Sequence, residues 1–293
     1  MKIVLFGGSG QLGYELNSRA TDLNFSVIAP VTSEVDVSNL NQIQFLLERF
    51  KPELIINAAA YTAVDKAETE RDNAYRINCD GARHVAYAAR ELGARMIYVS
   101  TDYVFDGKES SPRTEEDPTN PLSVYGASKR AGEQAILETY PERSTIVRTS
   151  SLHGQRGVNF VHTMLDLFKK RDELTVVADQ IMTPTWAGWL AEVILDLGRL
   201  DAFGIYHASG SGQTTWYDFA LTILERARHT IDRPERISIK PITAAEFGRP
   251  APRPAYSVFD TSKLSQTLGR TPIDWQRGLN AHLMDIGILE RKL

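Results

Sequence analysis

The feature that most constrains the fold is a short strand followed directly by a glycine-rich turn. Residues 2–6 (KIVLF) run into Gly7-Gly8-Ser9-Gly10-Gln11-Leu12-Gly13, and a helical pattern continues to Leu23. Glycines at this spacing permit a tight turn, close approach of the backbone to a pyrophosphate, and close packing of the helix on the strand. The helix N-terminus then offers free N–H groups and a positive dipole end. Because the turn opens the first strand–helix unit, we predict a dinucleotide site here.

Short apolar runs alternate with amphipathic stretches over the first half of the chain. The runs are nearly continuous in apolar character, which is typical of parallel strands covered on both faces. Such alternation favours strand–helix–strand units with right-handed crossovers. We therefore predict an α/β fold with a Rossmann-type doubly wound parallel sheet. Further strands are expected at 26–29, 54–57, 96–100 and 145–148, and helices at 10–23, 40–50, 72–92 and 125–140.

After about residue 150 the alternation loosens and helical patterns dominate. We expect a smaller, mostly helical C-terminal substrate-binding domain that closes over the sheet. The predicted division is a Rossmann domain at 1–150 and a substrate-binding part at 151–293, with segments near 175–210 returning to the first domain. Helices are expected at 159–170, 186–197, 215–227 and 276–290, and one more strand at 204–208.

Charge and cysteine content exclude several classes of function. The formal net charge is -4 over 293 residues, with both signs spread along the chain, which is no footprint for nucleic acid or an anionic membrane. Cys79 is the single cysteine, so neither an intramolecular disulfide nor a thiolate metal cage is expected. No apolar stretch is long enough for a leader or a membrane span. We expect a cytoplasmic monomer or homodimer without nucleic-acid or membrane partners.

Three hydroxyl and amine side chains form a candidate catalytic set. Thr101 follows an expected strand, at the edge of a parallel sheet where ligands bind. Tyr125 and Lys129 lie one turn apart on an expected helix, so they share a face. A neighbouring cation is expected to lower the phenol pKa, and a general acid works best when its pKa lies near the operating pH. Combined with the glycine turn, the set predicts carbonyl reduction with Tyr125 as proton donor and Thr101 orienting the substrate oxygen.

The sequence does not choose between NADH and NADPH. NAD sites commonly have an acid at the end of the second strand, and NADP sites have an arginine nearby. Here that strand ends in Pro30-Val31-Thr32-Ser33, with Glu34 slightly late. Asp36 and Val37 either border the adenine or, since Asp36 suits a helix entry, form a simple cap.

No metal site is expected from the histidines. The six are scattered, and no pair has the ligand spacing with a carboxylate that would indicate zinc. The sequence leaves open whether another divalent ion binds.

The chain resembles the extended short-chain dehydrogenase/reductase family, and within it the enzymes that reduce dTDP-4-keto-6-deoxy sugars at C4. Four stretches carry the resemblance and span almost the whole chain. They are Asn57–Glu68 (NAAAYTAVDKAE), Ser100–Gly107 together with Tyr125–Lys129, Asp179–Thr185 (DQIMTPT) and Arg253–Ser257 (RPAYS).

The resemblance implies a role for each matching residue. Tyr125 gives a proton to the C4 oxygen as the nicotinamide gives a hydride to C4, and Lys129 holds the nicotinamide ribose and tunes Tyr125. The substrate-facing residues implied are Thr101, Asp102, Tyr103 and Ser151. The residues implied to hold NADPH or NADH are Gly7, Gly10, Gln11, Leu12, Gly13, Asp36, Val37, Ala60, Tyr61, Thr62, Val99, Tyr125 and Lys129.

Two departures from the family pattern concern the sugar. Ser151 stands where the family commonly has a tryptophan that packs on the sugar, and Tyr256 stands where a small amide is usual. Two other functions fit the same scaffold: a non-catalytic regulatory subunit, and a sugar-nucleotide dehydratase or epimerase. The intact set of Thr101, Tyr125 and Lys129 argues against a regulatory role. Tyr103 replaces the glutamate that dehydratases commonly use as base, whereas epimerisation stays open.

Overall fold

A six-stranded, wholly parallel sheet forms the centre of the molecule. The computed structural model describes residues 1–232 and 234–290. The strand order is β10-β5-β4-β3-β1-β2, so the order reverses between β1 and β3. The doubly wound parallel sheet expected from the sequence is confirmed. The strands are β1 (Lys2–Phe6), β2 (Ser26–Ile28), β3 (Leu54–Asn57), β4 (Arg95–Thr101), β5 (Ser144–Thr149) and β10 (Gly204–His207).

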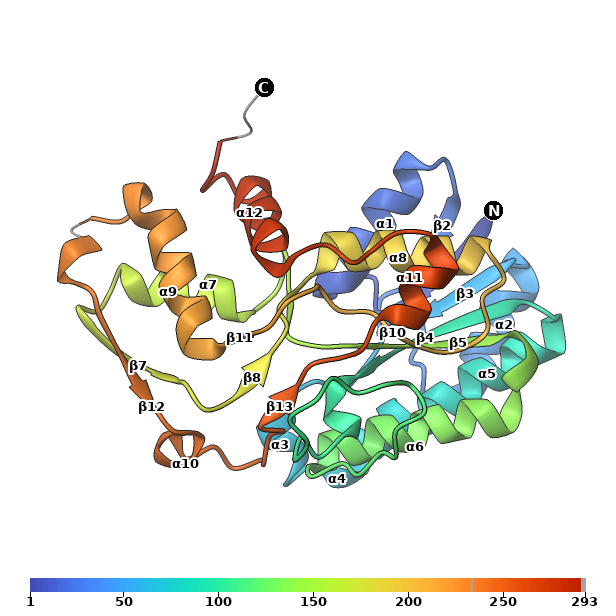
Figure 1. Cartoon of the computed structure of the whole chain (residues 1–293). Coiled ribbons are helices and arrows are strands. Elements are labelled where there is room, and N and C mark those ends of the chain that lie inside the picture. Colours follow the sequence, from blue (N-terminus) through green and yellow to red (C-terminus); the bar gives the residue numbers. More distant parts are fainter. Residues whose placement is uncertain (233, 291–293) are drawn as a thin grey trace.

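Helices cover both faces of this sheet, which explains why its strands are apolar on both sides. On one face, α1 and α8 share a buried core with α11; on the other, α2, α5 and α6 share a second core (Figure 1). The first group is α1 (Gln11–Asp22), α8 (Ala187–Arg199) and α11 (Ser262–Leu268). The second group is α2 (Leu40–Phe50), α5 (Gly81–Leu92) and α6 (Val124–Thr139).

The single helix expected at 72–92 is divided in the structure. It begins as α4 (Arg71–Tyr75), widens into a π-helical turn, η1 (Arg76–Asp80), and continues as α5. The widened turn contains Asn78, whose carbonyl accepts a hydrogen bond from the Tyr98 hydroxyl and whose amide donates to the Ser128 hydroxyl. The turn therefore forms where the helix is bound to both β4 and α6, a tertiary requirement that periodicity does not report.

A second body, built mainly from residues after 150, has its own core. Helices α7, α9 and α12 pack with two strands, β7 and β12, that the sequence analysis did not predict (Figure 1). Helix α8 and strand β10 return to the central sheet, and the boundary near residue 150 stays a prediction. The elements of the second body are α7 (Phe160–Phe168), β7 (Glu173–Val177), α9 (Trp216–Ala227), β12 (Ser238–Ile242) and α12 (Trp275–Asp285).

Short strands join the two bodies. Strand β6 (Leu152–His153) pairs with β9 (Thr185–Trp186), and β8 (Ile181–Met182) pairs with β11 (Thr214–Thr215) and β13 (Tyr256–Ser257). Within residues 1–232 and 234–290, no helix combines the length and the apolar character needed to cross a bilayer.

Candidate active site

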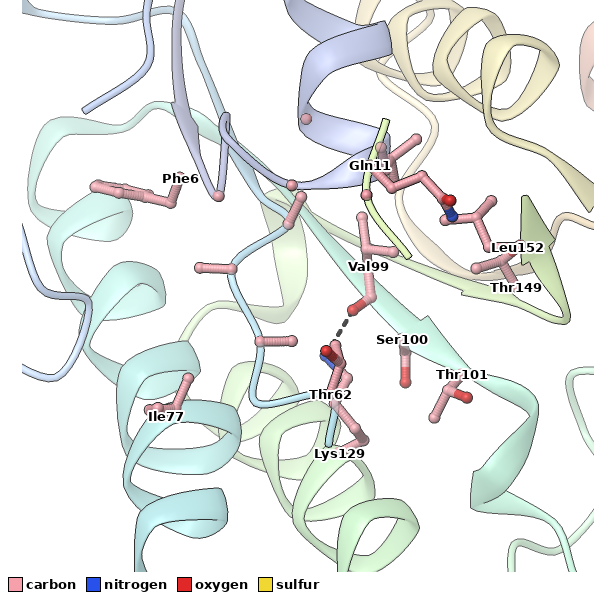
Figure 2. Close-up of a pocket in the computed structure, with 18 of the residues that line it drawn as sticks. Phe6, Gln11, Thr62, Ile77, Val99, Ser100, Thr101, Lys129, Thr149 and Leu152 are labelled. Carbon is pink, nitrogen blue, oxygen red and sulfur yellow. Dashed lines mark hydrogen bonds between the residues drawn. The ribbon is translucent and has the colours of Figure 1, made fainter. Parts of the chain in front are cut away.

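A cavity of about 800 Å³ opens where the strand order reverses, beyond the carboxyl ends of β1, β3 and β4. This is the position at which open α/β sheets bind ligands. The cavity brings together the predicted residues of the glycine turn, the end of β4 and the start of α6 (Figure 2). Tyr61 is the one predicted residue that does not line it. The predicted residues that do are Gly7, Gly10, Gln11, Leu12, Gly13, Asp36, Val37, Ala60, Thr62, Val99, Thr101, Asp102, Tyr103, Tyr125, Lys129 and Ser151.

The glycine turn leaves the N-terminus of α1 open to this cavity. Gly10 is the N-cap of α1, and no described side chain caps the helix there. A Cβ at Gly13 would lie 2.1 Å from the Gly7 carbonyl oxygen, so only glycine lets helix and turn approach so closely. The first-turn N–H groups are therefore available to an anionic pyrophosphate, which fits the predicted dinucleotide.

The far end of the cavity contains a cation that the sequence analysis missed. Arg76 from η1 donates to Asp36 Oδ2 at 3.2 Å, while Asp36 Oδ1 accepts from the backbone and hydroxyl of Ser38, both at 2.8 Å. Burial raises the pKa of Asp36, but these bonds outweigh it and lower that pKa overall. Asn39, rather than Asp36, caps α2 by accepting from Gln42 N. Asp36 and Arg76 thus line the cavity as a pair.

Thr101 and Tyr125 meet at the opposite end of the cavity. Thr101 is the last residue of β4, and its hydroxyl donates to Asp102 Oδ1 at 3.0 Å. Tyr125 lies in the first turn of α6, where a Cβ at Gly126 would be 2.2 Å from the Tyr103 carbonyl oxygen. This close packing puts the Tyr125 hydroxyl in hydrogen-bonding reach of Thr101. The two hydroxyl groups predicted to share one carbonyl oxygen are adjacent.

The ionisation of Tyr125 differs from the sequence-based expectation. Burial raises its pKa well above the ordinary value, with Asp102 and Tyr103 adding to the rise and a hydrogen bond with Thr101 opposing it. The nearby cation was expected to lower this pKa. In the structure, however, Lys129 Nζ donates to the Val99 carbonyl at 2.7 Å, as the dashed line in Figure 2 shows.

The charge on Lys129 is itself weakened by its surroundings. Burial lowers the Lys129 pKa to about 7, and the carboxylate of Glu133 opposes that shift. The ammonium also sits 3.9 Å from the centroid of the Tyr98 ring. The lysine is thus held in a dry position between strand β4 and helix α6.

A buried ion pair near the candidate catalytic residues was also missed. Glu133, one turn after Lys129 on α6, is fully buried and accepts from Ser100 Oγ at 2.6 Å. Arg148 on β5 donates to Glu133 twice, from Nε at 2.9 Å and from Nη2 at 2.8 Å. The four-residue spacing from Lys129 was the available sequence signal for Glu133. Glu133 thus connects α6 to β5 through Arg148, and to β4 through Ser100, the residue before Thr101.

A second cavity of about 850 Å³ adjoins the first, and Tyr103 lines both. The Tyr103 and Tyr125 rings lie edge to face, with centroids 5.4 Å apart, and burial raises the Tyr103 pKa to about 12. The other walls come from α7, β7, the start of α9 and residues 244–253. They include three cations and three large aromatic side chains, namely Arg171, Arg249, Arg253, Phe160, Trp216 and Phe247.

Of the two family departures, only Ser151 lines a cavity. Ser151 lines the first cavity with φ of +46°, a left-handed conformation that is uncommon outside glycine. Tyr256 donates its hydroxyl hydrogen to Gln213 Oε1 at 3.1 Å, away from the Thr101 set. The buried carboxyl of Asp102 lies beside Thr101, and burial raises the Asp102 pKa to about 6.

Three of the scattered histidines come together outside both cavities. His282 lies 3.0 Å from His153 and 3.4 Å from His162, nitrogen to nitrogen. In the part of the chain that the structure describes, no group of three or more histidine, cysteine or acidic side chains is arranged to hold a metal ion.

Comparison with known proteins decides the family. The family model described as the RmlD substrate binding domain matches residues 1–287. The chain belongs to the RmlD family. Among its relatives, the dTDP-4-dehydrorhamnose reductase of Aggregatibacter actinomycetemcomitans is 42% identical. The alignment covers 95% of this chain and 97% of that relative.

Two further RmlD-type comparisons bear on substrate and coenzyme. A probable dTDP-4,6-dihydroxy-2-methyloxan-3-one 4-ketoreductase of Streptomyces antibioticus is 39% identical, and the alignment covers 98% of this chain and 96% of that relative. The crystal structure of dTDP-4-dehydrorhamnose reductase from Bacillus anthracis, in complex with NADP, has a TM-score of 0.91 at 38% identity. The superposition covers 97% of this chain and 99% of the Bacillus anthracis chain.

Proposed function

We propose that this protein is an NAD(P)H-dependent oxidoreductase that reduces the C4 keto group of a dTDP-4-keto-6-deoxy sugar, with dTDP-4-dehydrorhamnose as substrate and dTDP-L-rhamnose as product. One observation carries the proposal. Thr101, Tyr125 and Lys129 all line the first cavity, which opens beside the glycine turn and adjoins a second cavity lined by arginine and aromatic side chains. The relatives named as dTDP-sugar reductases align with this chain over nearly its full length.

The first cavity suits the coenzyme. The open N-terminus of α1 would hold the pyrophosphate, Asp36 and Arg76 would border the adenosine, and Lys129 would bind the nicotinamide ribose. When bound, the nicotinamide supplies the hydride that reaches C4. The similar structure from Bacillus anthracis holds NADP, which supports NADPH as a coenzyme here.

Tyr125 would act as the proton donor. Its raised pKa keeps the phenol protonated at neutral pH, which is the form needed to give a proton to the C4 oxygen. Thr101 would donate a hydrogen bond to the same oxygen and so fix the carbonyl beside Tyr125. A cation on Lys129 favours the phenolate that remains after proton transfer.

The second cavity would hold the dTDP group. Its cations suit a diphosphate and its aromatic side chains suit a base, because planar rings stack and guanidinium groups pair with phosphate oxygens. Tyr103 lines both cavities, and Asp102 and Ser151 line the first, so these three residues would face the sugar between the two sites. Ser151 would leave that wall wider than a tryptophan would. We also infer that the protein is cytoplasmic and that it is a monomer or homodimer. The substrate-binding part is inferred to begin after residue 150.

The decisive experiment measures NAD(P)H oxidation with dTDP-4-keto-6-deoxy-L-mannose and identifies the product by NMR. We expect turnover by the wild type, and a kcat lower by ~10²–10⁴-fold in Tyr125→Phe, since that variant lacks the general acid. Tyr87→Phe, on α5 away from the cavity, is the matched control and should keep the wild-type rate. A folded, coenzyme-binding wild type that leaves the substrate unreduced would refute the assignment, and a changed sugar without oxidation of NAD(P)H would indicate an epimerase.

A further inference from the structure

Asp65 joins its own segment to one that lies up to 188 positions later in the chain. It belongs to α3 (Val64–Ala67), which follows β3. Arg253 Nη2 donates to both carboxylate oxygens at 3.1 Å, Arg249 Nη1 donates to Oδ2 at 3.2 Å, and Ala251 N donates to Oδ1 at 3.2 Å. One carboxylate thus binds three positions of a single five-residue segment.

These contacts connect the walls of the two cavities. Val64, next to Asp65, lines the coenzyme cavity, whereas Arg249, Ala251 and Arg253 all line the second cavity. Asp65 itself lines neither. Its carboxylate therefore fixes the arginine wall of the second cavity relative to the coenzyme cleft without occupying either space.

The held arginine also contacts Tyr103, a neighbour of Tyr125. Arg253 hydrogen-bonds Tyr103, and the Tyr103 ring packs edge to face against Tyr125. The Arg253 guanidinium donates in addition to the Ala251 carbonyl, at 2.8 Å. Its orientation is therefore set on several sides before any substrate arrives. Such preorganisation raises affinity because little ordering is left to occur on binding.

A simpler explanation of these contacts is that Asp65 and the arginines only stabilise the fold as an ion pair. The exposure of the side chains and the position of the arginines argue against it. The Asp65 and Arg253 side chains are 26% and 20% exposed, respectively, and a partly exposed pair by itself contributes little to stability. Here both arginines held by Asp65 line a cavity whose third cation is Arg171. With Glu173 as the one acid among the described residues of its lining, the cavity has an excess of positive charge that suits a diphosphate, and Asp65 holds two of its three arginines.

We propose that Asp65 is a positioning residue that holds Arg249 and Arg253 so that the diphosphate of the sugar nucleotide meets a preformed pair of cations at a fixed distance from the coenzyme. The proposal rests on the function proposed above. It assigns Asp65 to substrate affinity and predicts no part for it in coenzyme binding.

The test compares Asp65→Asn with wild type in three measurements: the Kd of dTDP, the Kd of NADPH, and the KM and kcat of the reaction. We expect the dTDP Kd and the sugar-nucleotide KM to rise on the order of tenfold, with kcat changed much less and the NADPH Kd unchanged. Asp72→Asn, an exposed acid on α4, is the matched control and should leave all values at the wild-type level. Asp65→Glu keeps the charge and should recover part of the dTDP affinity.

A double-mutant cycle shows whether Asp65 acts through the two arginines that it holds. In an Arg249→Gln/Arg253→Gln background, Asp65→Asn should weaken dTDP binding far less than it does in the wild type, because both arginines that it positions are gone. Equal losses in both backgrounds, or a lower Tm with an unchanged dTDP Kd, would overturn the proposal. The dTDP measurement needs no turnover, so its failure is distinguishable from failure of the reductase assignment.

Discussion

The ammonium nitrogen of Lys129 lies 2.7 Å from the carbonyl oxygen of Val99, so the lysine predicted to assist catalysis is bound to the backbone of β4. Tyr98 lies under the same ammonium, and Glu133 follows one turn later on α6. Because burial lowers the Lys129 pKa to about 7, the charge of this residue changes within the physiological range.

NADPH affinity should therefore depend on pH through Lys129. Lys129 is cationic below its pKa of about 7 and loses its proton as the pH rises above it. An anionic coenzyme favours the cation, so the NADPH Kd should rise by up to about tenfold per pH unit above that point. Fluorescence titration at a series of pH values on both sides of this pKa measures the NADPH Kd. Lys129→Met should bind more weakly with a flat profile, and an equally steep profile in that variant would contradict the prediction.

The Glu133–Arg148 pair should stabilise the fold as a unit. Glu133→Gln leaves the buried Arg148 guanidinium without a carboxylate partner, at a cost of about 3–5 kcal/mol in the free energy of unfolding. Arg148→Gln should cost less, because Arg130 still donates to Glu133 at 3.3 Å. The double variant removes both charges and should cost much less than the sum of the single changes. Urea unfolding of the four proteins measures this coupling. Additive losses would show that the two side chains act independently.

Gly13→Ala should abolish tight coenzyme binding. The added Cβ would lie 2.1 Å from the Gly7 carbonyl oxygen, so turn and helix must separate and the N–H cradle must open. We expect the NADPH Kd to rise on the order of a hundredfold. Gly93→Ala is the control, because no described atom lies within 4 Å of the position that its Cβ would take and only its left-handed φ of +66° is strained. It should lose about 1–2 kcal/mol of stability and keep the wild-type Kd.

Asp102 should make the fold less stable as the solution approaches neutrality. Its folded pKa is raised to about 6 from an ordinary value of 3.8, so the folded protein holds this proton more tightly than the unfolded chain does. The associated stability is present below the ordinary pKa and is lost as the pH rises through about 6, up to about 3 kcal/mol. Thermal unfolding over this range should show the loss in the wild type and a flatter profile in Asp102→Asn. Identical pH profiles of stability in the wild type and in Asp102→Asn would contradict this prediction.

Local patterns were enough to predict the central sheet and most of the site. Strands β1 and β3 were predicted to the residue, and the three predicted catalytic residues, each in a recognisable local context, line one cavity. The glycine spacing and the Tyr125–Lys129 turn depend on backbone geometry within a few residues. Sequence alone therefore reports them.

Contacts between distant segments were beyond such patterns. Arg76 pairs with Asp36 from 40 positions away, and Asp65 binds Arg253 from 188 positions away. The division of the helix at η1 likewise depends on the packing of Asn78 against β4 and α6.

The sequence by itself determined the dinucleotide-binding sheet and the set of groups able to reduce a carbonyl, because periodicity and spacing along one segment dictate which side chains share a face. Only the tertiary structure decided the direction of Lys129, the raised pKa of Tyr125 and the arginine wall held by Asp65. Those properties arise from burial and from charges contributed by other segments, and they come into being only when the layers pack.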